Sequence, residues 1–184
     1  LRGSLEAVKA LLERLDLEKV ELQALEEHQD HVLEKYKPTV SHRMMLMLLR
    51  KGEERLQMKH PIVKLDVADA EQIVTIMREA DPEIWGAVTS QQTVEGMSRG
   101  NNWFGIKING ELTSISSTRL TEWAGLIGVV ATQAAHRNKG YATSLVSESV
   151  KQILEKQPTA MIFVLTDNAP ALRVYSKVGF KPYR

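Results

Sequence analysis

Residues 136–145, HRNKGYATSL, mark the point where an extended segment ends and a helical pattern begins. The run before them, AGLIGVVAT at 124–132, is nearly continuous in apolar side chains, which predicts a central strand. The residues after Gly140 carry small or apolar side chains at 142, 145, 146, 150 and 153, the spacing of a helix that packs on a sheet. A buried strand that turns at a glycine into an amphipathic helix indicates an α/β fold.

The corner between this strand and this helix has the properties of an anion site. A helix N-terminus exposes unpaired N–H groups and about half a positive charge. Gly140 lets a ligand approach the backbone closely, Lys139 adds attraction, and Arg137 suits a forked contact with phosphate. A diphosphate is therefore expected here, although a solvated turn that merely starts a helix has the same local pattern. The P-loop and Rossmann patterns are both absent around Gly140.

The elements around this corner alternate between strand and helix. A strand is predicted at 61–66, followed by a helix capped by Asp66 or Asp69 and ended by Asp81-Pro82. A loop with Trp85 and a helix at about 91–98 come next. Asn109-Gly110 predicts a hairpin. A buried strand at 161–165 and a helix at about 169–178, ended by Gly179, complete the pattern. We expect a mixed sheet flanked by helices.

The first part of the chain is expected to be an N-terminal extension over residues 1–55, with the main domain at 56–184. Helices are predicted at Leu5–Leu15 and Glu26–Tyr36, and HRMMLMLLR at 42–50 is interpreted as a strand rather than a buried helix. The segment HVLEKYKPTVSHRM weakly resembles RVYSKVGFKPYR near the other end. A degenerate internal duplication is therefore left open, with the extension as a half-copy of the main domain.

The composition narrows the class of protein. With 43% hydrophobic and 26% charged residues, the chain is of the soluble globular type. A net charge of +1 gives no reason to expect nucleic-acid binding, and the longest apolar runs are too short to span a membrane. No secretory leader is visible, and a cytoplasmic location is expected. There are no cysteines, which excludes disulfides, thiolate metal sites and a cysteine nucleophile. No metal is expected.

A second motif lies downstream, in TDNAPALRVYSKVGF at 166–180. Pro170 is tolerated only in the first turn of a helix, so the helix begins near Asn168. Asn168 and Tyr175 are seven residues apart and project on the same helix face. Both predicted helices begin at the carboxyl ends of neighbouring strands, the edge where open α/β sheets bind ligands. By itself, Tyr175 would be interpreted as a core aromatic.

Together the two motifs resemble the GNAT superfamily of acyl-CoA-dependent N-acyltransferases. The family pattern runs V-x-x-x-P-x-x-R-x-x-G-x-A, then a helix, a strand, and N-x-x-A-x-x-x-Y-x-x-x-G-F. The matching residues are Val130, Arg137, Gly140, Ala142, Asn168, Ala171, Tyr175, Gly179 and Phe180. The run GVVATQAAHRNKGYATSLV at 128–146 is similar to the glycine N-acyltransferase-like branch. The resemblance covers residues 61–184.

This resemblance implies a V-shaped cleft for coenzyme A between the strands at 124–132 and 160–166. The implied cofactor-binding residues are Val130, Ala131, Thr132, Arg137, Asn138, Lys139, Gly140, Tyr141, Ala142, Thr143, Asn168 and Ala171. Main-chain groups of Val130 and Thr132 would pair with pantetheine, and the amides from Arg137 to Thr143 would hold the diphosphate. Tyr175 would be the catalytic general acid that protonates the departing thiolate. The acyl group, acetyl by default, would pass from acetyl-CoA directly to a primary amine.

The sequence departs from the family pattern in three places. Ala134 replaces the usual proline, and Leu126 occupies a position where several relatives carry a carboxylate base. Glu122 and His136 are the remaining candidates for the base, although a solvated surface role is favoured for each. The chain begins with Leu1 and ends at Arg184, where the family expects a further strand. We therefore expect a truncated chain, or a partner, such as a second copy in a homodimer, that completes the sheet.

The acceptor is expected to be a small-molecule or peptide amine, selected by the 81–93 loop with Trp85 and by Trp103 and Trp123, although packing roles are favoured for the tryptophans. The main alternative to an enzyme is a non-catalytic acyl-CoA-binding regulatory or interaction domain. A nucleotide-binding module that uses the same anion corner is the other alternative.

Overall fold

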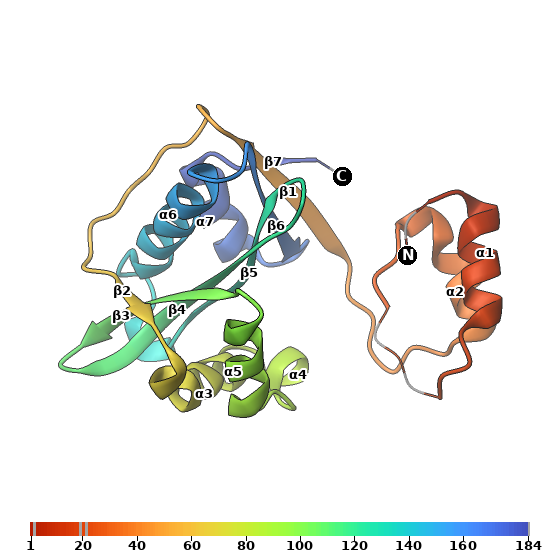
Figure 1. Cartoon of the computed structure of the whole chain (residues 1–184), viewed down its shortest axis with the longest axis horizontal. Helices are drawn as coiled ribbons and strands as arrows, with labels where there is room; N and C mark the ends of the chain where they lie inside the picture. The colour runs from red at the N-terminus through yellow and green to blue at the C-terminus, as the bar shows by residue number, and fades with distance from the viewer. Residues whose placement is uncertain (2, 19, 21, 184) are drawn as a thin grey trace. The chain divides into compact units, whose positions relative to one another are not determined.

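The computed structural model describes residue 1, residues 3–18, residue 20 and residues 22–183. They form two compact units, Leu1–His42 and Arg43–Arg184 (Figure 1). The sequence placed the boundary between residues 55 and 56. The structure divides the chain earlier because strand β1 (Met44–Arg50) pairs along its whole length with a strand of the second unit. Met47 and Leu49 of this strand are 1% and 0% exposed, so β1 is part of the main core.

The first unit contains the two predicted helices, α1 (Leu5–Arg14) and α2 (Gln29–Lys35), with a short 3₁₀ helix, η1 (Glu26–His28), leading into α2. Ser4 caps α1 by accepting a hydrogen bond from the Ala7 amide at 3.3 Å. The Tyr36 hydroxyl, just after α2, donates to the Leu15 carbonyl at 3.2 Å and ties the two helices together. The duplication stays a prediction.

The second unit is built on a seven-stranded mixed sheet in the order β2-β3-β4-β5-β6-β1-β7, which confirms the predicted fold class. The remaining strands are β2 (Val63–Leu65), β3 (Asn102–Ile108), β4 (Glu111–Leu120), β5 (Gly125–Thr132), β6 (Thr159–Leu165) and β7 (Lys181–Pro182). Asn109 and Gly110 both have positive φ, +52° and +87°, the backbone of a tight hairpin turn between β3 and β4. The predicted hairpin is confirmed. Only β5 and β6 pair in parallel among the strands described.

The side of β6 that faces away from β5 is paired by β1, antiparallel over seven residue pairs from Met44 to Arg50. A further strand from beyond Arg184, or from a partner, was expected to complete the sheet. In the structure β1, which precedes the rest of the domain in sequence, lies beside β6, and the short strand β7 pairs with β1 in turn. The apolar run at 44–49 explains this position, because a strand covered on both sides must be apolar.

Two groups of helices cover the sheet (Figure 1). Helix α3 (Ala70–Ala80), with α4 (Pro82–Trp85) and α5 (Ser90–Ser98), packs against β2 to β5 through a core that includes Ile73, Met77 and Trp103. Helices α6 (Tyr141–Leu154) and α7 (Ala169–Val178) belong to a second core with β1, β5 and β6. Of the two caps considered for this helix, Asp66 is the one that forms: its side chain caps the 3₁₀ helix η2 (Val67–Asp69), which leads into α3, in a capping box with Asp69. Helix α4 was predicted as a loop.

The described part of the chain contains no helix with both the length and the apolar character needed to cross a membrane.

Candidate active site

Strands β5 and β6 are paired at one end only. Gly125, Leu126 and Ile127 pair with residues 160–162 of β6, and no pairing between the two strands is recorded for the described residues beyond them. On its other side, β5 stays paired with β4 as far as Thr132. From Gly128 onward, β5 therefore presents a free edge toward β6, as the predicted V-shaped cleft requires.

A β-bulge lies where the two strands separate. Thr118 pairs with Ile127, but Ser116 pairs with Val130, so β5 has one residue more than β4 over this interval. Ser117 takes part in closing the irregularity, because its hydroxyl accepts a hydrogen bond from the Val129 amide at 3.0 Å. A bulge bends its strand and increases the local twist. This bend accounts for the loss of pairing with β6 at the same point.

Hydrogen bonds on the β4 side indicate which main-chain groups of β5 face the opening. The Ala131 carbonyl accepts from the Ser114 hydroxyl at 3.0 Å, and the Gln133 amide donates to the Thr113 carbonyl at 3.0 Å. Since consecutive residues of a strand direct their main-chain groups to opposite sides, Val130 and Thr132 direct theirs toward β6. Ala131 directs its main chain toward β4, and its side chain is buried at 6% exposure.

The N-terminus of α6 follows directly from this strand. Gly140 precedes the helix with φ +83° and provides no side-chain cap. The first main-chain bond of the helix runs from the Ser144 amide to the Gly140 carbonyl at 3.1 Å. Among the described residues, no recorded hydrogen bond uses the amide N–H groups of residues 138–143. Unpaired amides at the start of a fourteen-residue helix form a site for an anionic group.

The loop before α6 contains the remaining predicted diphosphate residues. Asn138 has φ +62°, a conformation that asparagine tolerates better than most residues. Arg137 and Lys139 are exposed. The Arg137 Nε donates to the Thr132 carbonyl at 3.2 Å. Arg137 thus contacts one of the two main-chain groups that were expected to bind pantetheine, and it links the end of β5 to the helix start.

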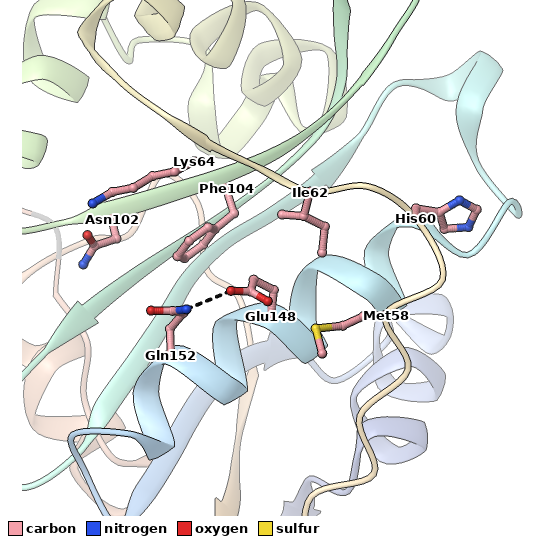
Figure 2. A pocket seen from close by; sticks show the side chains of 8 residues that line it. All are labelled: Met58, His60, Ile62, Lys64, Asn102, Phe104, Glu148 and Gln152. Carbon is pink, nitrogen blue, oxygen red and sulfur yellow. Dashed lines mark hydrogen bonds between the residues drawn. The ribbon is translucent and has the colours of Figure 1, made fainter.

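An extended segment at 55–62 reaches the same helix start, and the sequence analysis did not identify it. The Gln57 amide donates to the Ser147 hydroxyl at 2.9 Å, and the Lys59 amide donates to the Ser144 hydroxyl at 3.1 Å. The segment thereby runs along α6 toward the N-terminus of the helix, and His60 of the segment lies beside that N-terminus (Figure 2). The His60 ring meets the Tyr141 ring edge-on at 4.7 Å between centroids. The spaced serines on the buried side of α6 were the available signal.

The same segment forms one wall of a cavity of about 390 Å³ that α6 lines together with strands β2 and β3. Glu148 and Gln152 of α6 line it and are joined by a hydrogen bond of 2.9 Å (Figure 2). The described residues that line this cavity do not include the free edge of β5.

Helix α7 carries the second predicted motif. The Asn168 side chain caps the helix by accepting a hydrogen bond from the Ala171 amide at 3.1 Å, so the two residues are joined by a structural contact. Tyr175 is 6% exposed, and its ring lies 6.2 Å from that of Phe180. Tyr175 belongs to a core cluster that includes Ile127, and Val130 packs against this cluster. Burial raises the pKa of the Tyr175 phenol above its ordinary value, which keeps the hydroxyl protonated.

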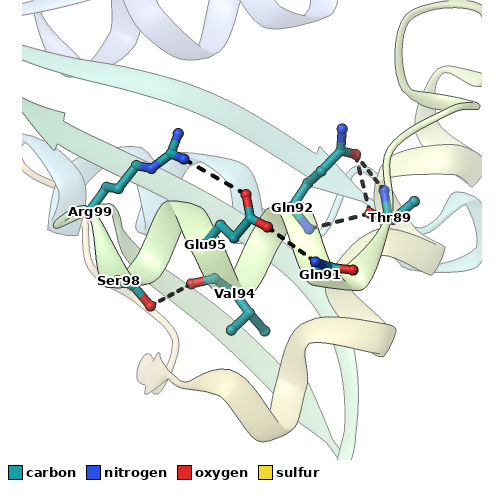
Figure 3. Close-up of polar contacts among 7 residues, drawn as sticks. All are labelled: Thr89, Gln91, Gln92, Val94, Glu95, Ser98 and Arg99. Atoms are coloured by element: carbon teal, nitrogen blue, oxygen red, sulfur yellow. Dashed lines mark hydrogen bonds and ion pairs between the residues drawn. The ribbon is translucent and has the colours of Figure 1, made fainter.

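A second cavity, of about 360 Å³, lies on the face of the sheet that α3 and α5 cover. Leu126, Gly128 and Val129 line it, so it reaches β5 at the bulge. The polar residue Gln92 also lines it, and its position is set by a capping box with Thr89 at the start of α5 (Figure 3). The full lining is Met77, Trp85, Val88, Gln92, Thr93, Gly96, Asn101, Trp103, Ser117, Thr118, Arg119, Leu126, Gly128 and Val129.

Only some of the tryptophans and candidate bases named from the sequence line this cavity. Trp85 and Trp103 line it, whereas Trp123 is 77% exposed and is not among its lining residues. Glu122 is exposed in the turn between β4 and β5, and His136 stacks near Tyr141 at 6.3 Å. Neither is among the residues that line the cavity.

Comparison with known proteins agrees with this geometry. A family model described as FR47-like protein matches residues 104–184. No curated protein sequence matched the chain. The solved structures that resemble it include a protein from Novosphingobium aromaticivorans assigned to the GNAT family of acetyltransferases, with 21% identity and a TM-score of 0.62 over 77% of this chain and 61% of that one.

Two further solved structures have the same fold. A GNAT-family acetyltransferase from Colwellia psychrerythraea has 15% identity and a TM-score of 0.64, over 85% of this chain and 58% of that chain. The PaiA N-acetyltransferase from Thermoplasma acidophilum, solved in complex with coenzyme A, has 16% identity and a TM-score of 0.57, over 66% of this chain and 89% of that chain. The chain thus spans about three fifths of the length of the Novosphingobium and Colwellia proteins. The chain has the GNAT fold, which it shares with these acetyltransferase structures.

Proposed function

We propose that this protein is an N-acyltransferase that moves an acetyl group from acetyl-CoA to a primary amine. The observation that carries the proposal is the free edge of β5, which leads directly into the unpaired amides at the N-terminus of α6. The free edge of β5 suits an extended chain with amide groups, and the unpaired amides at the N-terminus of α6 suit a diphosphate. Coenzyme A contains these two parts in that order. The coenzyme A complex of the Thermoplasma neighbour supports the same ligand.

Separate residues of the chain bind the different parts of coenzyme A. Amides of residues 138–143 hold the diphosphate, and main-chain groups of Val130 and Thr132 pair with the pantetheine. To free the Thr132 carbonyl, Arg137 releases it and turns to a phosphate, for which its guanidinium is suited. The Val130 amide lies on the free edge and stabilises the negative charge that develops on the thioester oxygen.

Tyr175 is proposed as the general acid. The acceptor nitrogen attacks the thioester carbon, the carbon–sulfur bond breaks, and the thiolate takes a proton from the Tyr175 hydroxyl. Water takes the proton that the amine loses and returns one to Tyr175. The raised pKa of Tyr175 keeps its hydroxyl protonated before the reaction, so that a proton is present when the thiolate leaves.

Within the superfamily, we propose the glycine N-acyltransferase-like branch, on the basis of the run at 128–146. A non-catalytic acyl-CoA-binding domain is the second candidate function. It is favoured by one observation: Leu126 lines the cavity at the position where several relatives carry a base.

Calorimetry with acetyl-CoA and with ATP, followed by an assay of free thiol in the presence of amines, tests these proposals. The enzyme proposal expects heat with acetyl-CoA, no competition from ATP, and thiol release that depends on the amine. Binding without any thiol release supports the regulatory domain. Binding of ATP in place of acetyl-CoA would overturn both.

A further inference from the structure

The side chains of β5 change their order at the bulge. In a regular strand, residues two apart point to the same face of the sheet. Ile127 belongs to the core formed with α6 and α7, whereas Val129 belongs to the core formed with α3. Beyond the bulge the alternation resumes in this shifted order, because Val130 packs against the first core and Ala131 lies in the second. One extra residue thus determines which face of the sheet each later side chain meets.

The bulge also determines which main-chain groups face the free edge of β5. With the bulge in place, Val130 and Thr132 direct their main-chain groups toward β6. A slip of one residue exchanges the two sides for every residue beyond it. In a strand without the bulge, these two residues would therefore turn toward β4. The Val130 amide, proposed to stabilise the thioester oxygen, is in position only while the bulge is kept.

Ser117 is placed to hold this extra residue. It lies on β4 opposite Gly128 and Val129, and the described pairing of the two strands includes neither of them. The Ser117 hydroxyl accepts a hydrogen bond from the Val129 amide at 3.0 Å. Ser117 and Val129 are 7% and 8% exposed, so water is a poor substitute for this acceptor. Because a buried amide without a partner is costly, loss of the hydroxyl would favour a slipped strand over the bulged one.

Gly128 leaves the space that the Ser117 hydroxyl occupies. A Cβ at residue 128 would lie 3.0 Å from the Ser117 Oγ atom, closer than most side-chain contacts. The backbone of Gly128 is outside the left-handed region, so its conformation does not require a glycine. A glycine within a strand often marks a close approach. Here it lets the hydroxyl of one strand reach the main chain of the other.

On the basis of the proposed function, we infer that Ser117 is a positioning residue for the acyl transfer. Its hydroxyl holds the Val129 amide on the β4 side, which keeps the next amide, that of Val130, on the side of the thioester oxygen. Ser117 itself supplies no proton and makes no contact with the substrate. Its loss should therefore lower the rate rather than the binding of coenzyme A, because a misplaced donor acts mainly on the transition state.

Ser117→Ala is the first test, and Ser116→Ala is its matched control. Ser116 is the neighbouring residue on β4 and is 0% exposed, but its hydroxyl bonds to the Ser149 hydroxyl of α6 at 2.8 Å. Both variants lose one buried hydroxyl, and only Ser117→Ala is expected to lower kcat, by roughly 10- to 100-fold. Calorimetric affinity for coenzyme A should change little in either variant. Ser117→Thr keeps the hydroxyl and should recover most of the turnover. Equal kcat in the two alanine variants, or no recovery in Ser117→Thr, would overturn the inference.

Gly128→Ala tests the same contact from β5. Its methyl group would press on the Ser117 hydroxyl, so kcat should fall as it does in Ser117→Ala. Gly128 also lines the cavity at the bulge, where a methyl group takes up space. In the double variant with Ser117→Ala, Gly128→Ala should cost little further kcat, because the contact is already gone. Full additivity would place the effect in the cavity and refute the role of Ser117. If Ser117→Ala fails to fold, an unchanged kcat in Gly128→Ala would refute it as well.

Hydrogen exchange at the Val129 amide provides a readout that does not depend on turnover. This amide should exchange roughly 10-fold or more faster in Ser117→Ala than in the wild type, and Ser116→Ala should leave its exchange unchanged. Unchanged exchange in Ser117→Ala would overturn the inference. A wild-type protein that releases no thiol with any amine would instead refute the proposed function, and the catalytic role of Ser117 with it. The exchange data would still decide whether Ser117 holds the bulge.

Discussion

Replacing Gly140 with alanine tests the diphosphate site most directly. Gly140 has φ +83°, and a Cβ there would lie 3.5 Å from the His60 Nε2 atom, an ordinary van der Waals distance. The variant therefore has room to fold, and its cost in stability is the left-handed backbone conformation alone, about 1–2 kcal/mol. For a chain of this length that corresponds to a fall in Tm of roughly 2–8 °C.

The effect on coenzyme A should be larger than this strain. The new methyl group would lie at the helix start, among the amides of residues 138–143 that have no recorded partner. A hydrogen bond to a charged group contributes about 1.5–3 kcal/mol. Loss of one such bond would weaken coenzyme A binding by roughly 10- to 150-fold, measured by isothermal titration calorimetry.

Gly110→Ala is the matched control. Gly110 has φ +87°, and nothing lies within 4 Å of a Cβ built on it. It has the same conformational cost in the hairpin turn between β3 and β4, where the new methyl group would contact no atom of the helix start. Both variants should lose similar stability, and only Gly140→Ala should lose coenzyme A affinity. Equal affinity for coenzyme A in the two variants would refute the placement of the diphosphate.

Three other substitutions test the chemistry and the packing. Tyr175→Phe should lower turnover by up to roughly 10²-fold, because it removes the general acid, while the calorimetric affinity for coenzyme A stays the same. Gly125→Ala should lower the free energy of unfolding in urea by about 1–3 kcal/mol, since its Cβ would lie 2.3 Å from the Ile153 Cγ2 atom. Asp69→Asn should cost about 1 kcal/mol at neutral pH, because it removes the 2.8 Å ion pair with Lys107 and weakens a capping box.

The pH dependence of the Asp69 effect has a definite sign. Burial alone would raise the pKa of Asp69, but hydrogen bonds from the Lys107 ammonium and the Asp66 amide outweigh it and lower the pKa. The contribution of Asp69 is therefore present above the ordinary carboxyl pKa, near 3.9, and is lost as the pH falls below it. The difference between wild type and Asp69→Asn should shrink below about pH 4, and a constant difference would contradict this origin.

The substitutions Gly125→Ala and Tyr175→Phe each have their own control. In the background of Ile153→Ala, which removes the closest atoms, Gly125→Ala should cost less than in the wild type, and strict additivity would exclude the clash. For Tyr175→Phe, unchanged turnover would remove Tyr175 from the mechanism, and a parallel loss of coenzyme A affinity would indicate a packing role.

Local features of the sequence determined most of the elements. The Asn109-Gly110 turn, the Asp66 cap, the break at Pro82 and the left-handed Gly179 all appear in the structure where the sequence predicted them. Each depends on the conformational preferences of a few adjacent residues, so neighbouring sequence contains the whole signal. The anion corner at Gly140 was predicted for the same reason, because a glycine at a helix start leaves its amides unpaired.

What the tertiary structure alone decided involves residues that are far apart in the chain. The position of β1 beside β6 depends on a pairing between residues 44–50 and 159–165. The separation of β5 from β6 depends on one extra residue opposite Ser117, which no local pattern marks. The cavity combines Trp103 with helices and strands from residue 77 to residue 129. A serine hydroxyl has many possible partners, and only the bulge opposite Ser117 brings the Val129 amide to it.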